Sequence, residues 1–155
     1  MWSGDNRLAQ WHVGAYASDL TGRFSHCAAS AKDRNGIYLT YSFTTNSNWH
    51  MGLASKKWRL TPGDEYSIKY RVDDGRPDSV IAKAADNQTT RFKDNADLFN
   101  AFRRGRTLHV RVQSTDLAFN ITNTSLILDF LQKCVASGGN FDEVADKPSP
   151  SPPAT

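Results

Sequence analysis

Apolar and polar side chains alternate with a period of two residues along much of this 155-residue chain. In the clearest segment, residues 37–44 (IYLTYSFT), large apolar or aromatic residues occupy the odd positions and hydroxyl-bearing residues the even ones. Successive side chains of a strand point to opposite faces, so such a segment buries one face and exposes the other. That arrangement is typical of antiparallel sheets, because parallel sheets are covered on both faces. The pattern therefore predicts a mainly β fold, either an antiparallel β-sandwich or an open barrel.

Further segments carry the same alternation or a shorter apolar run, and turn-forming sequences separate them. Asn35-Gly36 suits a hairpin turn that needs positive φ. The sequences TPGD at 61–64 and DDGRP at 73–77 also have turn composition. We therefore expect additional strands over residues 11–16, 24–30, 49–53, 66–73, 79–84, 89–92, 108–113 and 116–121.

Two short helices are expected to cover the open ends of this β structure. The first extends from Asp94, as the N-cap, to Gly105, with Leu98, Ala101 and Phe102 on one side. The second lies within residues 119–135, where apolar residues recur with the spacing i, i+3, i+4 and i+7. These residues are Ile127, Phe130, Leu131 and Cys134.

The two cysteines, Cys27 and Cys134, are too few for a disulfide scaffold and too far apart for a zinc-binding pair. Their separation of 134 − 27 = 107 positions suits one long-range bridge between an expected strand and the second helix. Closing a loop of that size contributes about 4–5 kcal/mol in the chain-entropy model. We therefore predict a Cys27–Cys134 disulfide, with two buried, reduced cysteines as the alternative. Such a bond persists only in an oxidising compartment, so the prediction implies that location.

The length predicts one domain with a core large enough to fold without a metal. We expect residues 1–9 to form a disordered or arm-like N-terminus, 10–139 a single β-rich domain and 140–155 a linker or tail rich in proline and serine. The sequence KPSPSPPAT at 147–155 has the composition of an extended linker. A linker here favours either a further domain beyond Thr155 or an unstructured tail.

Several function classes are disfavoured by the sequence. The net charge of +3 is too small to indicate a nucleic-acid-binding protein by itself. No stretch approaches the roughly 18 consecutive apolar residues of a membrane span. No G-x-S-x-G nucleophile elbow occurs. We therefore expect neither a membrane-spanning protein nor a nucleic-acid partner.

The histidines and cysteines do not form a pattern that indicates catalysis. His26 and Cys27 are adjacent on an expected strand, so their side chains point to opposite faces and cannot act as a hydrogen-bonded pair. His12, His50 and His109 have no spacing that a metal site would require. We therefore expect no enzymatic activity, no metal and no cofactor.

One polar feature is concentrated enough to be a candidate binding surface. Three arginines fall within four residues at the expected end of the first helix, and a fourth follows on the next strand. Guanidinium groups match the geometry of carboxylates and phosphates. An acidic glycan, a lipid surface or a protein would be a suitable partner, and a solvated helix end is the alternative. The expected patch comprises Arg103, Arg104, Arg106 and Arg111.

Aromatic side chains form a second candidate surface, because exposed rings stack on pyranose faces in sugar-binding modules. Trp11 and Trp49 share strand parity with aliphatic residues and are expected in the core. Tyr16, Tyr38 and Trp58 are the rings that we expect to be exposed. They favour carbohydrate binding as an alternative function.

A set of hydrophobic and turn positions is spread over residues 11–135. It comprises Trp11-His12-Val13, Cys27, residues 49–53, Trp58-Arg59-Leu60, Thr61-Pro62-Gly63, Val72-Asp73, residues 98–105, Phe119, Leu131 and Cys134. This set resembles the invasion-associated locus B family of bacterial envelope proteins. The resemblance implies a periplasmic or secreted protein involved in host-cell association, and it supplies no catalytic residues. Family members often have a cysteine where this chain has Ala15-Tyr16, so a second family disulfide is not expected.

Together these features predict a non-enzymatic interaction module of the bacterial periplasm or exterior, with a partner that the sequence does not identify. The alternative is a carbohydrate-binding or accessory domain of a larger enzyme that continues beyond the proline-rich tail.

Overall fold

The predicted alternation is present in the structure, a computed structural model that describes residues 11–18, 20–93, 96–112 and 114–140. In β3 (Tyr38–Thr44), Leu39, Tyr41 and Phe43 are buried and the intervening residues are half-buried. The expected N-terminal arm and most of the expected tail, residues 1–9 and 141–155, lie outside the described residues.

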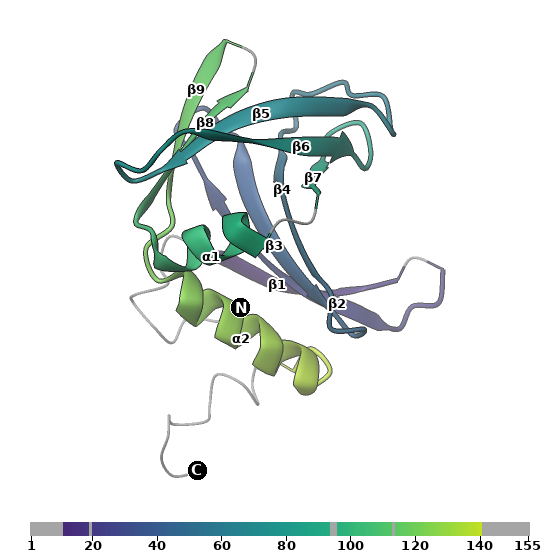
Figure 1. Cartoon of the computed structure of the whole chain (residues 1–155). Helices are drawn as coiled ribbons and strands as arrows, with labels where there is room; N and C mark the ends of the chain where they lie inside the picture. The colour runs from purple at the N-terminus through teal and green to yellow at the C-terminus, as the bar shows by residue number, and fades with distance from the viewer. Residues whose placement is uncertain (1–10, 19, 94–95, 113, 141–155) are drawn as a thin grey trace.

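Nine strands form two antiparallel sheets in the described part of the chain, which confirms the predicted class of sandwich or open barrel (Figure 1). In the four-stranded sheet each strand pairs with the next along the chain. In the five-stranded sheet the order is β7-β6-β5-β8-β9, so β5 and β8 are neighbours although they are distant in sequence. Besides β3, the strands are β1 (His12–Ala17), β2 (Phe24–Lys32), β4 (Trp49–Ala54), β5 (Glu65–Val72), β6 (Asp78–Ala84), β7 (Thr90–Phe92), β8 (Thr107–Val112) and β9 (Thr115–Asn120).

The two sheets meet along the edge strands β4 and β7. Ala54 and Thr89 form an isolated antiparallel bridge, and the Thr90 hydroxyl bonds both the amide (3.2 Å) and the carbonyl (3.0 Å) of Leu53. A Cβ atom on Gly52 would lie 1.9 Å from the Thr90 carbonyl oxygen. Glycine is therefore required at position 52 for β7 to approach β4 this closely.

The first helix, α1 (Ala96–Arg104), fills the space between the sheets. Its Leu98 and Phe102 are buried, as predicted. The ring of Phe102 lies 6.3 Å from that of Tyr41 in the four-stranded sheet and 6.4 Å from that of Tyr70 in the five-stranded sheet. Phe102 therefore links the two halves of the core, while Asp94, its expected N-cap, lies outside the described residues.

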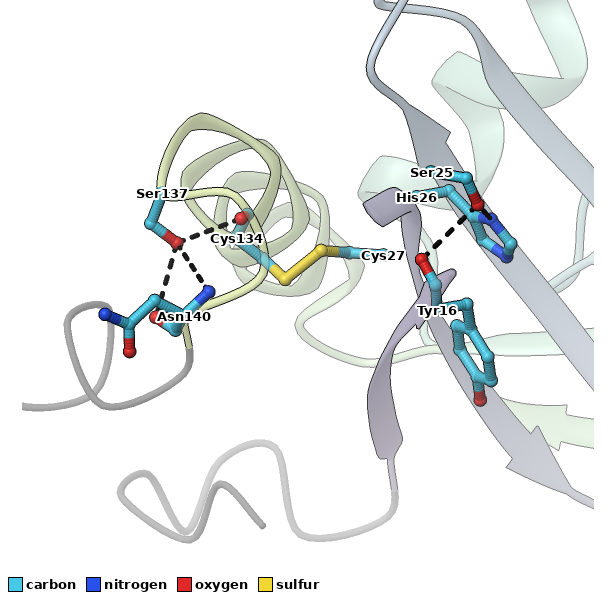
Figure 2. The surroundings of a disulfide bond; sticks show 7 residues. All are labelled: Tyr16, Ser25, His26, Cys27, Cys134, Ser137 and Asn140. Atoms are coloured by element: carbon cyan, nitrogen blue, oxygen red, sulfur yellow. Dashed lines mark hydrogen bonds between the residues drawn. A yellow bond between two sulfur atoms is a disulfide. The ribbon is translucent and has the colours of Figure 1, made fainter. Parts of the chain in front are cut away.

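The second helix, α2 (Thr124–Ala136), packs on the inner face of the four-stranded sheet, where Cys134 bonds Cys27 of β2 (Figure 2). This confirms the predicted disulfide. The helix ends as expected, with the Gly139 amide donating to the Cys134 carbonyl. The four predicted apolar positions are buried: Ile127, Phe130, Leu131 and Cys134. Within the described ranges no helix is both long and apolar enough to cross a bilayer.

Burial along the first strand departs from simple alternation in one respect. Trp11 is buried and Val13 packs against the core, but Ala15 is exposed although it shares their parity. Since β1 is the edge of its sheet, the core does not extend beneath its whole length.

Candidate binding surface

Basic side chains gather on the outer face of the five-stranded sheet. Alternation places Tyr70 and Val110 in the core, so Lys69 and Arg71 of β5 and His109 and Arg111 of β8 face outward. Lys69 lies opposite Arg111 across the two strands, and Arg71 lies opposite His109. The four side chains therefore form a compact block, which we call the basic quartet.

The basic quartet lines an open groove with a volume of about 480 Å³. This volume lies in the range of small-ligand sites in proteins, roughly 300–1,000 Å³. The remaining lining residues come from β5, β8, β9 and the start of β6. They are Tyr70, Val110, Leu117, Asp116 and Pro77.

Acidic neighbours neutralise two of the three permanent charges of the quartet. Arg111 Nε lies 3.0 Å from an Asp116 carboxylate oxygen on β9, and Arg71 Nη1 lies 3.7 Å from Asp74. Both pairs are solvent-exposed and so contribute little to stability. Lys69 makes no ion pair with any residue that the structure describes. The ammonium group of Lys69 is therefore available to a ligand in the groove. Arg111, directly opposite Lys69, carries a charge of the same sign, and such a pair is unfavourable.

Asp73 fixes the turn at one end of the groove. It has a positive φ of 52°, and its carboxylate accepts hydrogen bonds from the backbone amides of Thr107 (2.9 Å) and Arg106 (3.1 Å). These two bonds, Thr107 first, hold the pKa of Asp73 below its ordinary value. The carboxylate thus ties the end of β5 to the start of β8 and sets the two strands that carry the quartet in register.

The arginines expected from the sequence to form one patch are divided in the structure. Arg103 and Arg104 are exposed at the end of α1, and Arg106 is exposed just before β8. The Arg103 guanidinium lies 5.9 Å from the centre of the Phe99 ring. Arg111 is five residues beyond Arg106, about 17 Å along an extended strand, and belongs to the quartet instead.

Lys69, Arg71 and His109 are the members of the quartet that sequence reasoning did not select. The sequence indicated part of this arrangement, because Lys69 and Arg71 lie on one face of their strand and His109 and Arg111 lie on one face of theirs. What local sequence did not show is that β5 and β8 are neighbours.

Of the three predicted surface rings, Tyr16 is half exposed, with 50% of its surface accessible. It stacks on His26 with ring centres 5.0 Å apart, and the Ser25 hydroxyl lies 2.7 Å from Nδ1 of that imidazole (Figure 2). Burial, followed by the charge of Arg91, lowers the pKa of His26. Tyr16 and His26 are direct cross-strand partners of β1 and β2, and the register shifts just beyond them, between Tyr16 and Ala17.

The other two rings are less accessible. Tyr38 is half-buried on the outer face of β3, and Trp58 is half-buried and packs against the core. Cys27 is held in the disulfide, so it is not a thiol nucleophile beside His26. Among the residues that the structure describes, no three histidine, cysteine or acidic side chains are grouped as metal ligands would be.

The comparison that bears on this arrangement is structural. The crystal structure of invasion-associated protein B from Bartonella henselae aligns with a TM-score of 0.58 over 83% of this chain and 95% of that chain. The two proteins share a fold. The family resemblance seen in the sequence is therefore confirmed for the fold. At 13% sequence identity, functional residues of one protein cannot be assigned to positions of the other. No family model matches the sequence, and no curated protein matches it.

Proposed function

We propose that this protein is a non-enzymatic interaction module of the periplasm or cell exterior that binds an acidic partner through exposed basic side chains. The observation that carries the proposal is the basic quartet, in which Lys69 and Arg111 are placed directly opposite each other at the surface. Asp116 offsets the charge of Arg111, so the ammonium of Lys69 is the charge that a bound anion would compensate. The patch at Arg103, Arg104 and Arg106 would extend this attraction toward the end of α1.

The Cys27–Cys134 disulfide supports the proposed location. The bond joins a core strand to α2 across a sequence separation of 107, so it is part of the folded core. Bonds of this kind persist where the surroundings are oxidising, as in the bacterial periplasm and outside the cell. The structural neighbour is named for association with invasion, and a role at the cell envelope would be consistent with that name.

Binding to an acidic partner is tested by its dependence on salt. Wild-type protein is titrated against an anionic polysaccharide and against vesicles containing an anionic lipid, at increasing sodium chloride concentration. Affinity should fall steadily with salt for at least one of them, because exposed charges are screened over about 10 Å at 0.1 M. Absence of salt-dependent binding to both would refute the proposed function. Free thiols in protein isolated under thiol-blocking conditions would refute the proposed location.

Carbohydrate binding through aromatic stacking is a second candidate, favoured by the half-exposed ring of Tyr16. The ring lies against Gly14, where a Cβ atom would be 2.9 Å from the phenolic oxygen, and it stacks on His26. A ring held in this way loses little freedom on binding a sugar face. Tyr16→Ala should then weaken binding to a neutral oligosaccharide, whereas Tyr38→Ala serves as a control ring on the same sheet.

A further inference from the structure

We propose that the groove over the basic quartet binds a carboxylate-bearing sugar unit of an acidic glycan. The inference rests on the proposed function and narrows it to one site and one ligand class. It assigns the ligand to Lys69 and Arg111 of the quartet and leaves the arginines at the end of α1 outside the site.

The spacing of the two charges fits a single anionic group. Directly opposite residues of an antiparallel pair have Cβ atoms about 5 Å apart, so one carboxylate can lie between the ammonium of Lys69 and the guanidinium of Arg111. The Arg111 ion pair is made through Nε, at 3.0 Å from Asp116. The terminal nitrogens of Arg111 are the donors best placed to turn toward a ligand carboxylate.

Acidic side chains around the quartet restrict what can approach it. Asp116 pairs with Arg111, and Asp74 pairs with Arg71. An anionic bilayer presents many negative groups over a wide plane, so it would bring several of them against these carboxylates. A discrete carboxylate placed between Lys69 and Arg111 meets the repulsion of Asp116 alone, and the Lys69 ammonium offsets it.

The size and lining of the groove also suit a sugar. Its cations line an open groove of about 480 Å³, which can hold a ring-sized group. Pro77 supplies an apolar surface on the β6 side of the groove, against which one face of a pyranose ring can pack. The lining therefore combines charged groups that orient a ligand with apolar contact area, as small-ligand sites do.

The test is calorimetric titration of the full chain with a hexamer of galacturonic acid, at one fixed low salt concentration. Lys69→Gln should weaken binding by about fivefold, the upper value for one exposed ionic contact. Asp116→Asn removes the competing carboxylate and should strengthen binding by about twofold to threefold. Lys57→Gln, which removes an exposed lysine that does not line the groove, should leave the affinity within twofold of wild type.

Two changes of opposite sign keep the test informative, and unchanged thermal unfolding shows that each variant is folded. Equal weakening by Lys69→Gln and Lys57→Gln would overturn the groove site, since net charge alone would then explain binding. Binding of anionic vesicles without binding of the uronate hexamer would also overturn it and leave the proposed function standing. The groove site is equally overturned if only the triple substitution of Arg103, Arg104 and Arg106 by alanine reduces binding. If no anionic probe binds at all, the proposed function itself fails.

Discussion

The two sheets expose very different outer faces. On the four-stranded sheet, the outward positions carry mainly small or hydroxyl-bearing residues such as Ala28, Ser42 and Thr40. They also include the imidazoles of His12, His26 and His50, and Lys32 at the end of β2 is charged. On the five-stranded sheet, the outward positions of β5 and β8 carry the basic quartet. We call β1–β4 with α2 the disulfide-linked half, and β5–β9 the charged half.

The covalent bond and the exposed charges thus lie in different halves. The disulfide joins β2 to α2, whereas the like charges of the quartet, which oppose folding slightly, lie on strands without a covalent link to a helix. The halves contact each other through α1, through β7 against β4 and through β9 against β2. The comparison indicates that the binding groups lie in the half without a disulfide, and the following predictions test that division.

Loss of the disulfide should have the largest effect. Replacing Cys27 and Cys134 together by alanine removes a link across 107 residues and should lower the free energy of unfolding by about 4–5 kcal/mol in the chain-entropy model. Urea denaturation measures the loss. Hydrogen exchange then tests the comparison: amides of β2 and α2 should lose more protection than those of β5 and β8. Equal loss throughout would show that the two halves unfold as one unit.

Removing the aromatic link between the halves should have the next largest effect. Phe102→Ala leaves a cavity between Tyr41 and Tyr70 and should cost about 3–4 kcal/mol. Phe99→Ala on the same helix is the matched control, because Phe99 is only half-buried and packs on Trp49. Similar losses for the two variants in denaturant titrations would mean that Phe102 does not connect the halves in particular.

The fold could be predicted largely because its strands follow simple local rules. Leu39, Tyr41 and Phe43 are buried as their parity requires, and Cys134 lies on the apolar face of α2 opposite Cys27. The closure between the sheets could not be predicted in this way. It depends on the missing side chain of Gly52, whose importance is visible only when Thr90 is placed against it.

The candidate site was harder to predict than the fold, for a physical reason. Nearness in sequence grouped Arg111 with Arg103, but an extended strand carries Arg111 away from the helix end. The neighbours of Arg111 are set by strand pairing, which places it beside Lys69 from a strand some forty positions earlier in the chain. Pairing between distant strands is decided by the whole core and leaves little local signal.

A smaller effect is expected from the buried hydroxyl of the disulfide-linked half. The Tyr41 phenol lies 3.4 Å from the Thr124 hydroxyl, which also donates to the Ile121 carbonyl at 2.6 Å. Tyr41→Phe removes one long hydrogen bond and leaves Thr124 with a partner, so it should cost about 1 kcal/mol or less. A loss above about 3 kcal/mol in urea titrations would show that the substitution also disturbs the packing of Trp11 on this ring.

The same residue makes the disulfide-linked half sensitive to alkali. Burial raises the pKa of Tyr41, so the folded state keeps a proton that the unfolded chain loses near pH 10. Stability should therefore fall as the pH rises above about 10, and Tyr41→Phe should make that fall shallower. Burial also raises the pKa of Tyr70, so some slope should remain in the variant. Identical slopes for both proteins would contradict the assignment to Tyr41.

The smallest effect is expected in the charged half, at acid pH and at Asp73. Hydrogen bonds from the Thr107 and Arg106 amides stabilise its carboxylate and lower its pKa below the ordinary value of 3.8. The stabilisation is present above pH 3.8 and is lost as the pH falls through the lower pKa of the folded state. Asp73→Asn tolerates the positive φ and retains one acceptor, so the variant should differ from wild type at neutral pH and converge with it in acid. Glu65→Gln is the matched control, since Lys93 lowers the pKa of Glu65 without joining β5 to β8.

If Asp73 sets the register of the quartet, Asp73→Asn should also weaken binding of the galacturonic acid hexamer, whereas Glu65→Gln should not. Unchanged binding by Asp73→Asn would show that this turn does not position the binding site.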